Sequence, residues 1–95
     1  MYIDSRTAIT QKLIAQVAAA AGADPATLTA ETALQDVGFD SILLAITLRS
    51  LEVEFSIEFE DEDIAGFFAA SSIGDYVGVM QRAQSRQTVR SAAAS

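Results

Sequence analysis

The sequence of 95 residues contains no cysteine and no histidine. Without cysteine the chain cannot form disulfides, use a thiolate nucleophile or bind metals through thiolates, and without histidine it lacks imidazole ligands. Histidine is also the side chain that most often serves as a general base near neutral pH. A serine nucleophile could be activated only by Lys12, the one lysine, or by a carboxylate. We therefore rank an enzymatic function lowest.

Basic residues are few: 6 stand against 13 acidic residues, which gives a formal net charge of −7. An acidic domain repels nucleic-acid phosphates, so we expect basic protein surfaces as partners and no nucleic acid. Long apolar runs are also missing. The stretch 17–21 is far short of the ~20 apolar residues that span a bilayer, and no basic targeting segment precedes it. The sequence therefore predicts a soluble, cytoplasmic protein with no membrane association.

The residues that are present favour one small domain, because 51% of them are hydrophobic and can form a packed core. A chain of this length typically buries only ~60% of its unfolded surface, which leaves little room for a deep catalytic cleft. We expect a module on which other proteins act.

Apolar residues recurring at helical spacing predict an all-α, four-helix bundle with one long loop after the first helix. The first helix is expected at about residues 5–21, with Asp4 or Ser5 as its N-cap. Residues 23–40 follow as the loop, with a brief helical turn at residues 34–37. A loop of this length inside a compact domain is unusual and is often functional.

The second long helix is expected at about residues 41–55. Its predicted buried face consists of Leu44, Leu48, Leu51 and Phe55. Four carboxylates at residues 60–63 suit the N-terminus of a short third helix. Ser72 and Asp75 have capping-box spacing and predict the start of the fourth helix.

Small and polar residues dominate the C-terminal end, so we place the folded domain at residues 1–82 and expect a disordered tail at residues 83–95. Arg82, Arg86 and Arg90 recur every four residues there. They could extend the last helix with a basic stripe, but we interpret them as a solvated, fraying end.

The segment Gly38-Phe39-Asp40-Ser41-Ile42 stands where the long loop ends and the second helix begins. Asp40 occupies the N-cap position. A phosphate on the Ser41 hydroxyl would lie at the positive end of the helix dipole and near unpaired amides. Phosphoester chemistry at Ser41 is permitted but not required, because serine also favours helix starts through local hydrogen bonds alone.

This segment resembles the Gly-x-Asp-Ser-Leu-like signature of the acyl and peptidyl carrier proteins, which marks the start of their second helix. Residues 32–38, 51–63 and 72–77 are also similar to that family. The resemblance covers about residues 5–82 and implies a four-helix bundle of the acyl-carrier-protein type.

The resemblance implies a covalent cofactor. A phosphopantetheinyl transferase would use coenzyme A to attach a 4′-phosphopantetheine arm to Ser41, and Asp40 would be part of what the transferase recognises. The thiol of the arm would hold an acyl, aminoacyl or peptidyl cargo as a thioester for loading and cargo-processing enzymes. The cofactor would thus supply the sulfur that the chain lacks. The protein would be a discrete, monomeric carrier with no catalytic residues of its own.

The chain departs from the fatty-acid-synthase carriers, which commonly place acidic residues soon after the modified serine. Here residues 42–46 are apolar and Arg49 is basic. Because Ile42, Leu43 and Ile46 cannot all face the core, we expect them and Arg49 to contact partners that recognise an apolar surface. The hypothesis is a pathway that makes polyketides or nonribosomal peptides. The alternative is that the three apolar residues pack under the long loop.

The acidic start of the third helix allows two interpretations. Glu62 and Asp63 could receive basic partners as part of a solvated helix start. Asp61, Asp63 and Gly66 also match three positions of an EF-hand loop, but Ser72 stands where the bidentate glutamate is required. We therefore expect no metal.

A function of a different class is a cofactor-free helical adaptor that binds a partner through its second helix. Such a protein would share the fold and the apolar surface and would not need Ser41. The cargo of a carrier is not readable from the sequence, because the loading enzyme chooses it.

Overall fold

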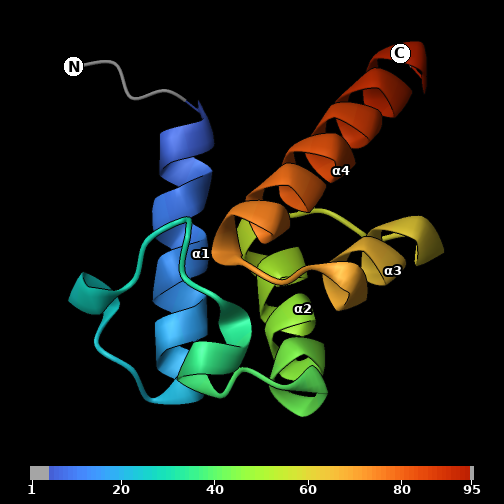
Figure 1. The fold of residues 1–95 in the computed structure, drawn as a ribbon. Helices are drawn as coiled ribbons and strands as arrows, with labels where there is room; N and C mark the ends of the chain where they lie inside the picture. Colours follow the sequence, from blue (N-terminus) through green and yellow to red (C-terminus); the bar gives the residue numbers. More distant parts are fainter. Residues whose placement is uncertain (1–4, 95) are drawn as a thin grey trace.

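A computed structural model describes the backbone of residues 5–94 and the side chains of residues 6–87. It confirms an all-α bundle, and no strand occurs within residues 5–94 (Figure 1). The helices are α1 (Ser5–Ala21), α2 (Ser41–Phe55), α3 (Asp61–Ala69) and α4 (Ile73–Ala94). The predicted cap Asp4 lies outside the described residues, and Ser5 is the first residue of α1.

The connection between α1 and α2 is ordered by two short 3-10 turns, η1 (Pro25–Thr27) and η2 (Leu34–Val37). The turn at η2 was predicted, whereas η1 was not. Asp24 caps η1 by accepting a hydrogen bond from the Ala26 N–H at 3.0 Å, and the following proline fixes a φ suited to the turn.

Backbone hydrogen bonds tie this connection to the start of α4. The Leu34 N–H donates to the Ser71 carbonyl at 3.0 Å, and the Gly74 N–H donates to the Ala30 carbonyl at 2.7 Å. A Cβ on Gly74 would stand 3.0 Å from that same carbonyl oxygen, so a larger residue would require the backbone at Ala30 to move. These hydrogen bonds fasten the second half of the loop, which leads into α2, to the start of α4.

Helix α2 begins and ends where the sequence predicts. The Asp40 side chain accepts a hydrogen bond from the Leu43 N–H at 2.9 Å, which satisfies one of the free amides of the first turn. Ser56 ends the helix in the left-handed region with φ 54°. On the predicted buried face Leu44, Leu48 and Leu51 are buried, but Phe55 is only partly buried.

The capping box predicted for α4 is also present. The Asp75 N–H donates to the Ser72 hydroxyl at 3.2 Å, and the Ser72 N–H donates to the Asp75 carboxylate at 3.2 Å. The Ser71 N–H also donates to that carboxylate at 3.0 Å, and these hydrogen bonds hold the pKa of Asp75 below its ordinary value.

Helix α4 continues to Ala94, so the domain boundary expected after residue 82 lies inside a helix. Ala83 is buried, the Arg86 side chain binds Glu62 in the first turn of α3, and the Gln87 side chain binds Ser56 just after α2. These tertiary contacts stabilise the helix as far as Gln87, and composition alone did not indicate them.

A row of aromatic rings packed edge to face links four parts of the chain: the α1–α2 connection, the segment between α2 and α3, α3 and α4. Ring centroids of Phe39 and Tyr76 lie 6.0 Å apart, those of Tyr76 and Phe67 5.3 Å, and those of Phe67 and Phe59 5.0 Å. Such pairs add about 0.5–1.5 kcal/mol each beyond area burial. They fix the end of the long connection against α3 and α4.

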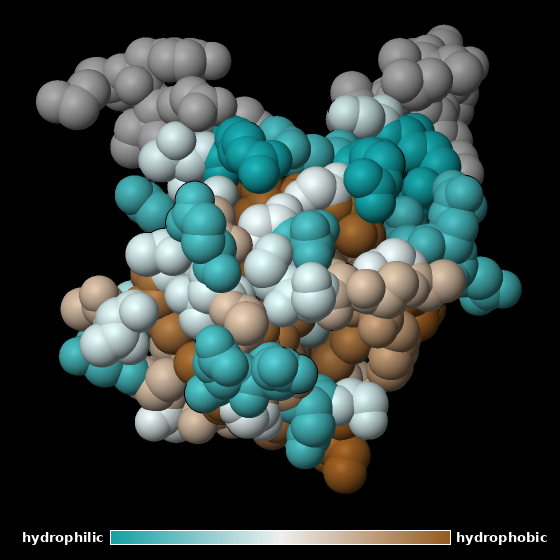
Figure 2. Space-filling view, in the orientation of Figure 1, coloured by the Kyte–Doolittle hydropathy of each residue, from teal (hydrophilic) through white to brown (hydrophobic). Residues whose placement is uncertain are grey.

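The surface differs from one end of the bundle to the other. Figure 2 shows hydrophilic side chains toward the C-terminal half of α4 and apolar side chains protruding at the lower end of α2. Within the described residues, no helix combines the length and apolar character needed to cross a bilayer.

Candidate functional site

The approach to Ser41 alternates between buried and exposed residues. Gly38 ends η2 with φ 70° and ψ 25°, a left-handed conformation that glycine adopts without steric cost. Phe39 then inserts into the core with 7% of its surface exposed. Asp40 and Ser41 follow on the surface. The chain thus presents the Ser41 hydroxyl to solvent from an anchored backbone.

Ser41 is the first residue of α2. The Asp40 side chain accepts a hydrogen bond from the Leu43 N–H only. The N–H groups of Ser41 and Ile42 are also in the first turn, and they have no acceptor within the helix. These amides and the helix dipole favour a negative group on the Ser41 oxygen. A phosphodiester at this oxygen therefore fits the site.

A groove of about 500 Å³ adjoins Ser41. It lies where the long connection, the start of α2, the end of α3 and the start of α4 meet. Its apolar and aromatic lining comes from Leu34, Phe39, Leu44, Phe67, Phe68 and Tyr76. Burial raises the pKa of Tyr76 to about 12, so its phenol stays neutral at physiological pH. The groove gives a chain attached to Ser41 an apolar wall beside its point of attachment.

Sequence reasoning predicted Ser41 and Asp40 as site residues but did not predict this groove. Its lining residues come from four separate elements, so no local spacing could have indicated it.

The predicted partner residues on α2 divide into two groups. Ile42 and Ile46 are 69% and 58% exposed, and Arg49 is exposed as well. Leu43 is partly buried and packs against the core. The alternative that all three apolar residues pack under the loop is therefore wrong for Ile42 and Ile46.

Val53, which is 74% exposed, extends the same face and was missed. We call Ile42, Ile46, Arg49 and Val53 the α2 stripe. Their spacing of i, i+4, i+7 and i+11 is a local signal that could have identified Val53.

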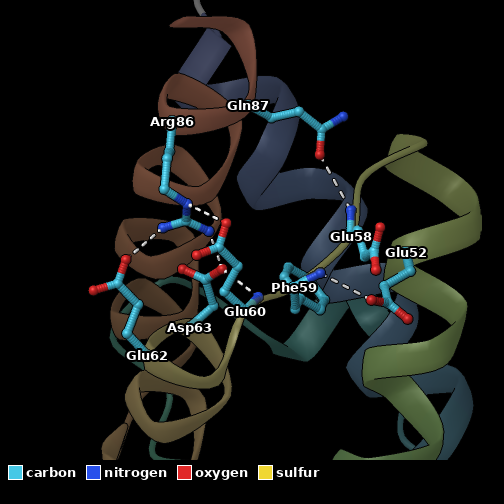
Figure 3. A network of polar contacts seen from close by, with 8 residues as sticks. All are labelled: Glu52, Glu58, Phe59, Glu60, Glu62, Asp63, Arg86 and Gln87. Atoms are coloured by element: carbon cyan, nitrogen blue, oxygen red, sulfur yellow. Dashed lines mark hydrogen bonds and ion pairs between the residues drawn. The ribbon is translucent and has the colours of Figure 1, made fainter. Parts of the chain in front are cut away.

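The acidic start of α3 requires two corrections. Asp63 was expected to be solvated, yet only 4% of its surface is exposed. Arg86 was interpreted as part of a solvated helix end, yet its guanidinium binds Asp63, Glu60 and Glu62 (Figure 3). Glu62 remains exposed, but Asp63 is no longer a candidate contact for partners, because the fold buries it.

The ion pair with Arg86 also changes the pKa of Asp63. Burial alone would raise the pKa of the Asp63 carboxyl, but hydrogen bonds from Arg86 and the Glu60 N–H, with the nearby arginine charges, bring the pKa below its ordinary value. Asp63 also closes a capping box with Glu60 at the start of α3. Residues 61–66 are therefore part of a helix and do not form an ion-binding loop.

Within the described part of the chain, no group of three or more acidic side chains is arranged to hold a metal ion.

The family model described as the phosphopantetheine attachment site matches residues 11–79, which is well over half of the chain. The matched region includes Ser41, the groove beside it and the α2 stripe. No curated protein matches the sequence.

Proposed function

Because this chain belongs to the phosphopantetheine attachment site family, we propose that it is a carrier protein whose 4′-phosphopantetheine is attached to Ser41. The family carries this group covalently, so the group is the cofactor of the domain and supplies a thiol that can hold cargo as a thioester. The carrier domain itself is not catalytic, and a phosphopantetheinyl transferase and loading enzymes act on it.

The observation that carries the assignment is the position of Ser41. Its side chain is exposed at the first residue of α2, two residues after the buried anchor Phe39, and it adjoins the groove. The chain contributes three effects there. The anchored backbone holds the hydroxyl where a transferase can reach it, the helix N-terminus favours the phosphodiester charge, and Asp40 fixes the first turn.

The test is intact-protein mass after incubation with coenzyme A, magnesium and a promiscuous phosphopantetheinyl transferase. We expect a gain of one phosphopantetheine in the unaltered protein and no gain in Ser41→Ala. Ser85→Ala is the matched control, because Ser85 is also an exposed helical serine and should leave the gain unchanged.

Two outcomes would contradict the assignment. Modification of Ser41→Ala would place the arm on another residue. No modification of folded protein, with a known carrier modified in parallel, would leave the cofactor-free adaptor as the better interpretation.

We further infer that the partner enzymes belong to polyketide or nonribosomal peptide biosynthesis. The support is the α2 stripe, which exposes two isoleucines and an arginine where carriers of fatty acid synthesis commonly present acidic residues. Among the predicted acidic contacts, Glu62 stays in this proposal because it is exposed. The monomeric state and the cytoplasmic location stay predictions.

A further inference from the structure

Arg86 on α4 is surrounded by carboxylates from the start of α3. Its Nε lies 3.3 Å from Glu60 Oε2, its Nη1 lies 2.9 Å from Glu62 Oε1, and its Nη2 pairs with Asp63 Oδ2 (Figure 3). Each guanidinium nitrogen therefore faces a different carboxylate. The arginine side chain is 25% exposed and that of Asp63 is 4% exposed, so this ion cluster reaches into the interior.

Gln87, the next residue, holds the segment that precedes α3. Its Nε2 donates to the Ser56 carbonyl at 3.1 Å, and its Oε1 accepts from the Glu58 N–H at 3.2 Å. From the other side, Glu52 on α2 accepts a hydrogen bond from the Phe59 N–H at 2.9 Å. We call Arg86 and Gln87 the α4 clasp, because together they fasten residues 56–63 to α4.

Helix α3, whose first turn Arg86 holds, also forms a wall of the groove beside Ser41. Phe67 and Phe68 both lie on α3 and line that groove, one buried and the other 52% exposed. Helix α3 has nine residues and its clasped end is its first turn. Because nine residues make only about two and a half helical turns, we expect a shift of the first turn to move both phenylalanines as well.

Loss of Arg86 would force such a shift. The Asp63 carboxylate would remain buried without its cation, and a buried charge without a partner is strongly destabilising. This cost would be reduced if the first turn of α3 moved outward until water reached the Asp63 carboxylate. Arg82 is close enough to influence Asp63 electrostatically, but it forms none of the three ion pairs described above.

We propose that Arg86 is a positioning residue: by holding the first turn of α3, it fixes the aromatic wall of the groove next to Ser41 and thereby sets how the arm and its cargo meet that wall. The first half of this inference concerns the fold alone. The second half rests on the proposed attachment of the arm to Ser41.

The first half is tested by hydrogen exchange on the protein without the arm. In Arg86→Ala we expect amides of residues 56–69 to exchange at least about tenfold faster, while those of α1 and α2 change much less. Arg86→Lys, which keeps the charge but loses the fork of donors, should give an intermediate result. Lys12→Ala is the matched control, because it removes an exposed ion pair of 2.8 Å to Glu54 elsewhere in the bundle.

Equally faster exchange throughout the chain in Arg86→Ala, or no increase in the exchange rate of residues 56–69, would overturn the positioning role. Gln87→Ala provides a second variant that leaves the three ion pairs intact. It should loosen residues 56–60, which precede α3, with little effect on α3 itself.

The second half is tested with an environment-sensitive fluorophore on a pantetheine arm, transferred to Ser41 from its coenzyme A conjugate. We expect Arg86→Ala to shift the emission maximum relative to the unaltered protein, and Lys12→Ala to leave it unchanged. Equal emission in spite of faster exchange in α3 would overturn the link to the groove. Failure of the unaltered protein to accept the arm would overturn the Ser41 assignment instead, and the exchange result would still decide the role of Arg86 in the fold.

Discussion

Polar side chains that lie inside or beside the bundle have distinct partners. The exposed carboxylates of Asp40 and Asp75 cap helix starts, and the buried carboxylate of Asp63 pairs with Arg86. Thr47 on α2 is different. Its side chain is 2% exposed, and within the described residues its hydroxyl oxygen has no hydrogen-bond partner.

Replacing Thr47 with valine should therefore stabilise the protein. Valine has nearly the same shape and removes a buried hydroxyl whose unpaired burial costs about 1–3 kcal/mol. We expect a gain of about 1 kcal/mol in the free energy of unfolding, measured by urea denaturation.

Thr10→Val is the matched control, because the Thr10 hydroxyl donates to the Arg6 carbonyl at 2.7 Å and should give no such gain. A Thr47→Val variant that is clearly less stable than the unaltered protein would show that the hydroxyl has a partner in solution.

Helix α2 has two faces with separate roles. Leu44, Leu48 and Leu51 pack into the core, while the α2 stripe stands in solvent beginning one residue after Ser41. An enzyme that reaches Ser41 must approach this end of the helix. We therefore expect the beginning of the stripe to contact such a partner.

Replacing Ile46 with alanine, or Arg49 with glutamate, should weaken reaction with enzymes that act at Ser41. Burial of an isoleucine against a partner contributes about 1.5–3 kcal/mol, so we expect kcat/KM for arm transfer by the phosphopantetheinyl transferase to fall about tenfold in Ile46→Ala. Steady-state kinetics with coenzyme A checks this.

Val53→Ala removes an exposed apolar side chain about 18 Å further along the axis from Ser41, and should have a smaller effect. Unchanged rates for both Ile46→Ala and Arg49→Glu would contradict a role for the stripe in partner recognition.

On the scale of the whole molecule, three of the 13 acidic residues of a chain with a net charge of −7 surround one arginine. Since the pKa of Asp63 is lowered in the folded state, the unfolded state binds more protons between that pKa and the unfolded value of about 3.9. The stabilisation that the ionised Asp63 carboxylate provides is complete above the pKa of the unfolded state. It is lost as the pH falls through the pKa of the folded state.

We therefore expect the free energy of unfolding to decrease as the pH falls below about 5, measured by urea denaturation at a series of acidic pH values. Asp63→Asn should flatten this dependence, because the asparagine does not titrate. An unchanged slope in Asp63→Asn would assign the acid sensitivity to other carboxylates, of which Asp75 also has a lowered pKa.

Much of the fold could be predicted because its signals are local. The span of α2, the cap at Asp40 and the capping box of Ser72 and Asp75 depend on residues within one turn of each other. The exposed Ser41 follows from the same signals, since a helix that begins at Ser41 with its cap on the surface presents that hydroxyl.

The sequence by itself determined where α2 begins and ends, that Leu44, Leu48 and Leu51 face the core, and that Ser41 stands exposed at the start of this helix. Only the tertiary structure decided that Asp63 is buried, that α4 continues past residue 82 and that a groove adjoins Ser41. The physical reason is distance along the chain. Asp63 and Arg86 are 23 residues apart and the groove joins four elements, so the solvation of each side chain depended on which distant segment packed over it.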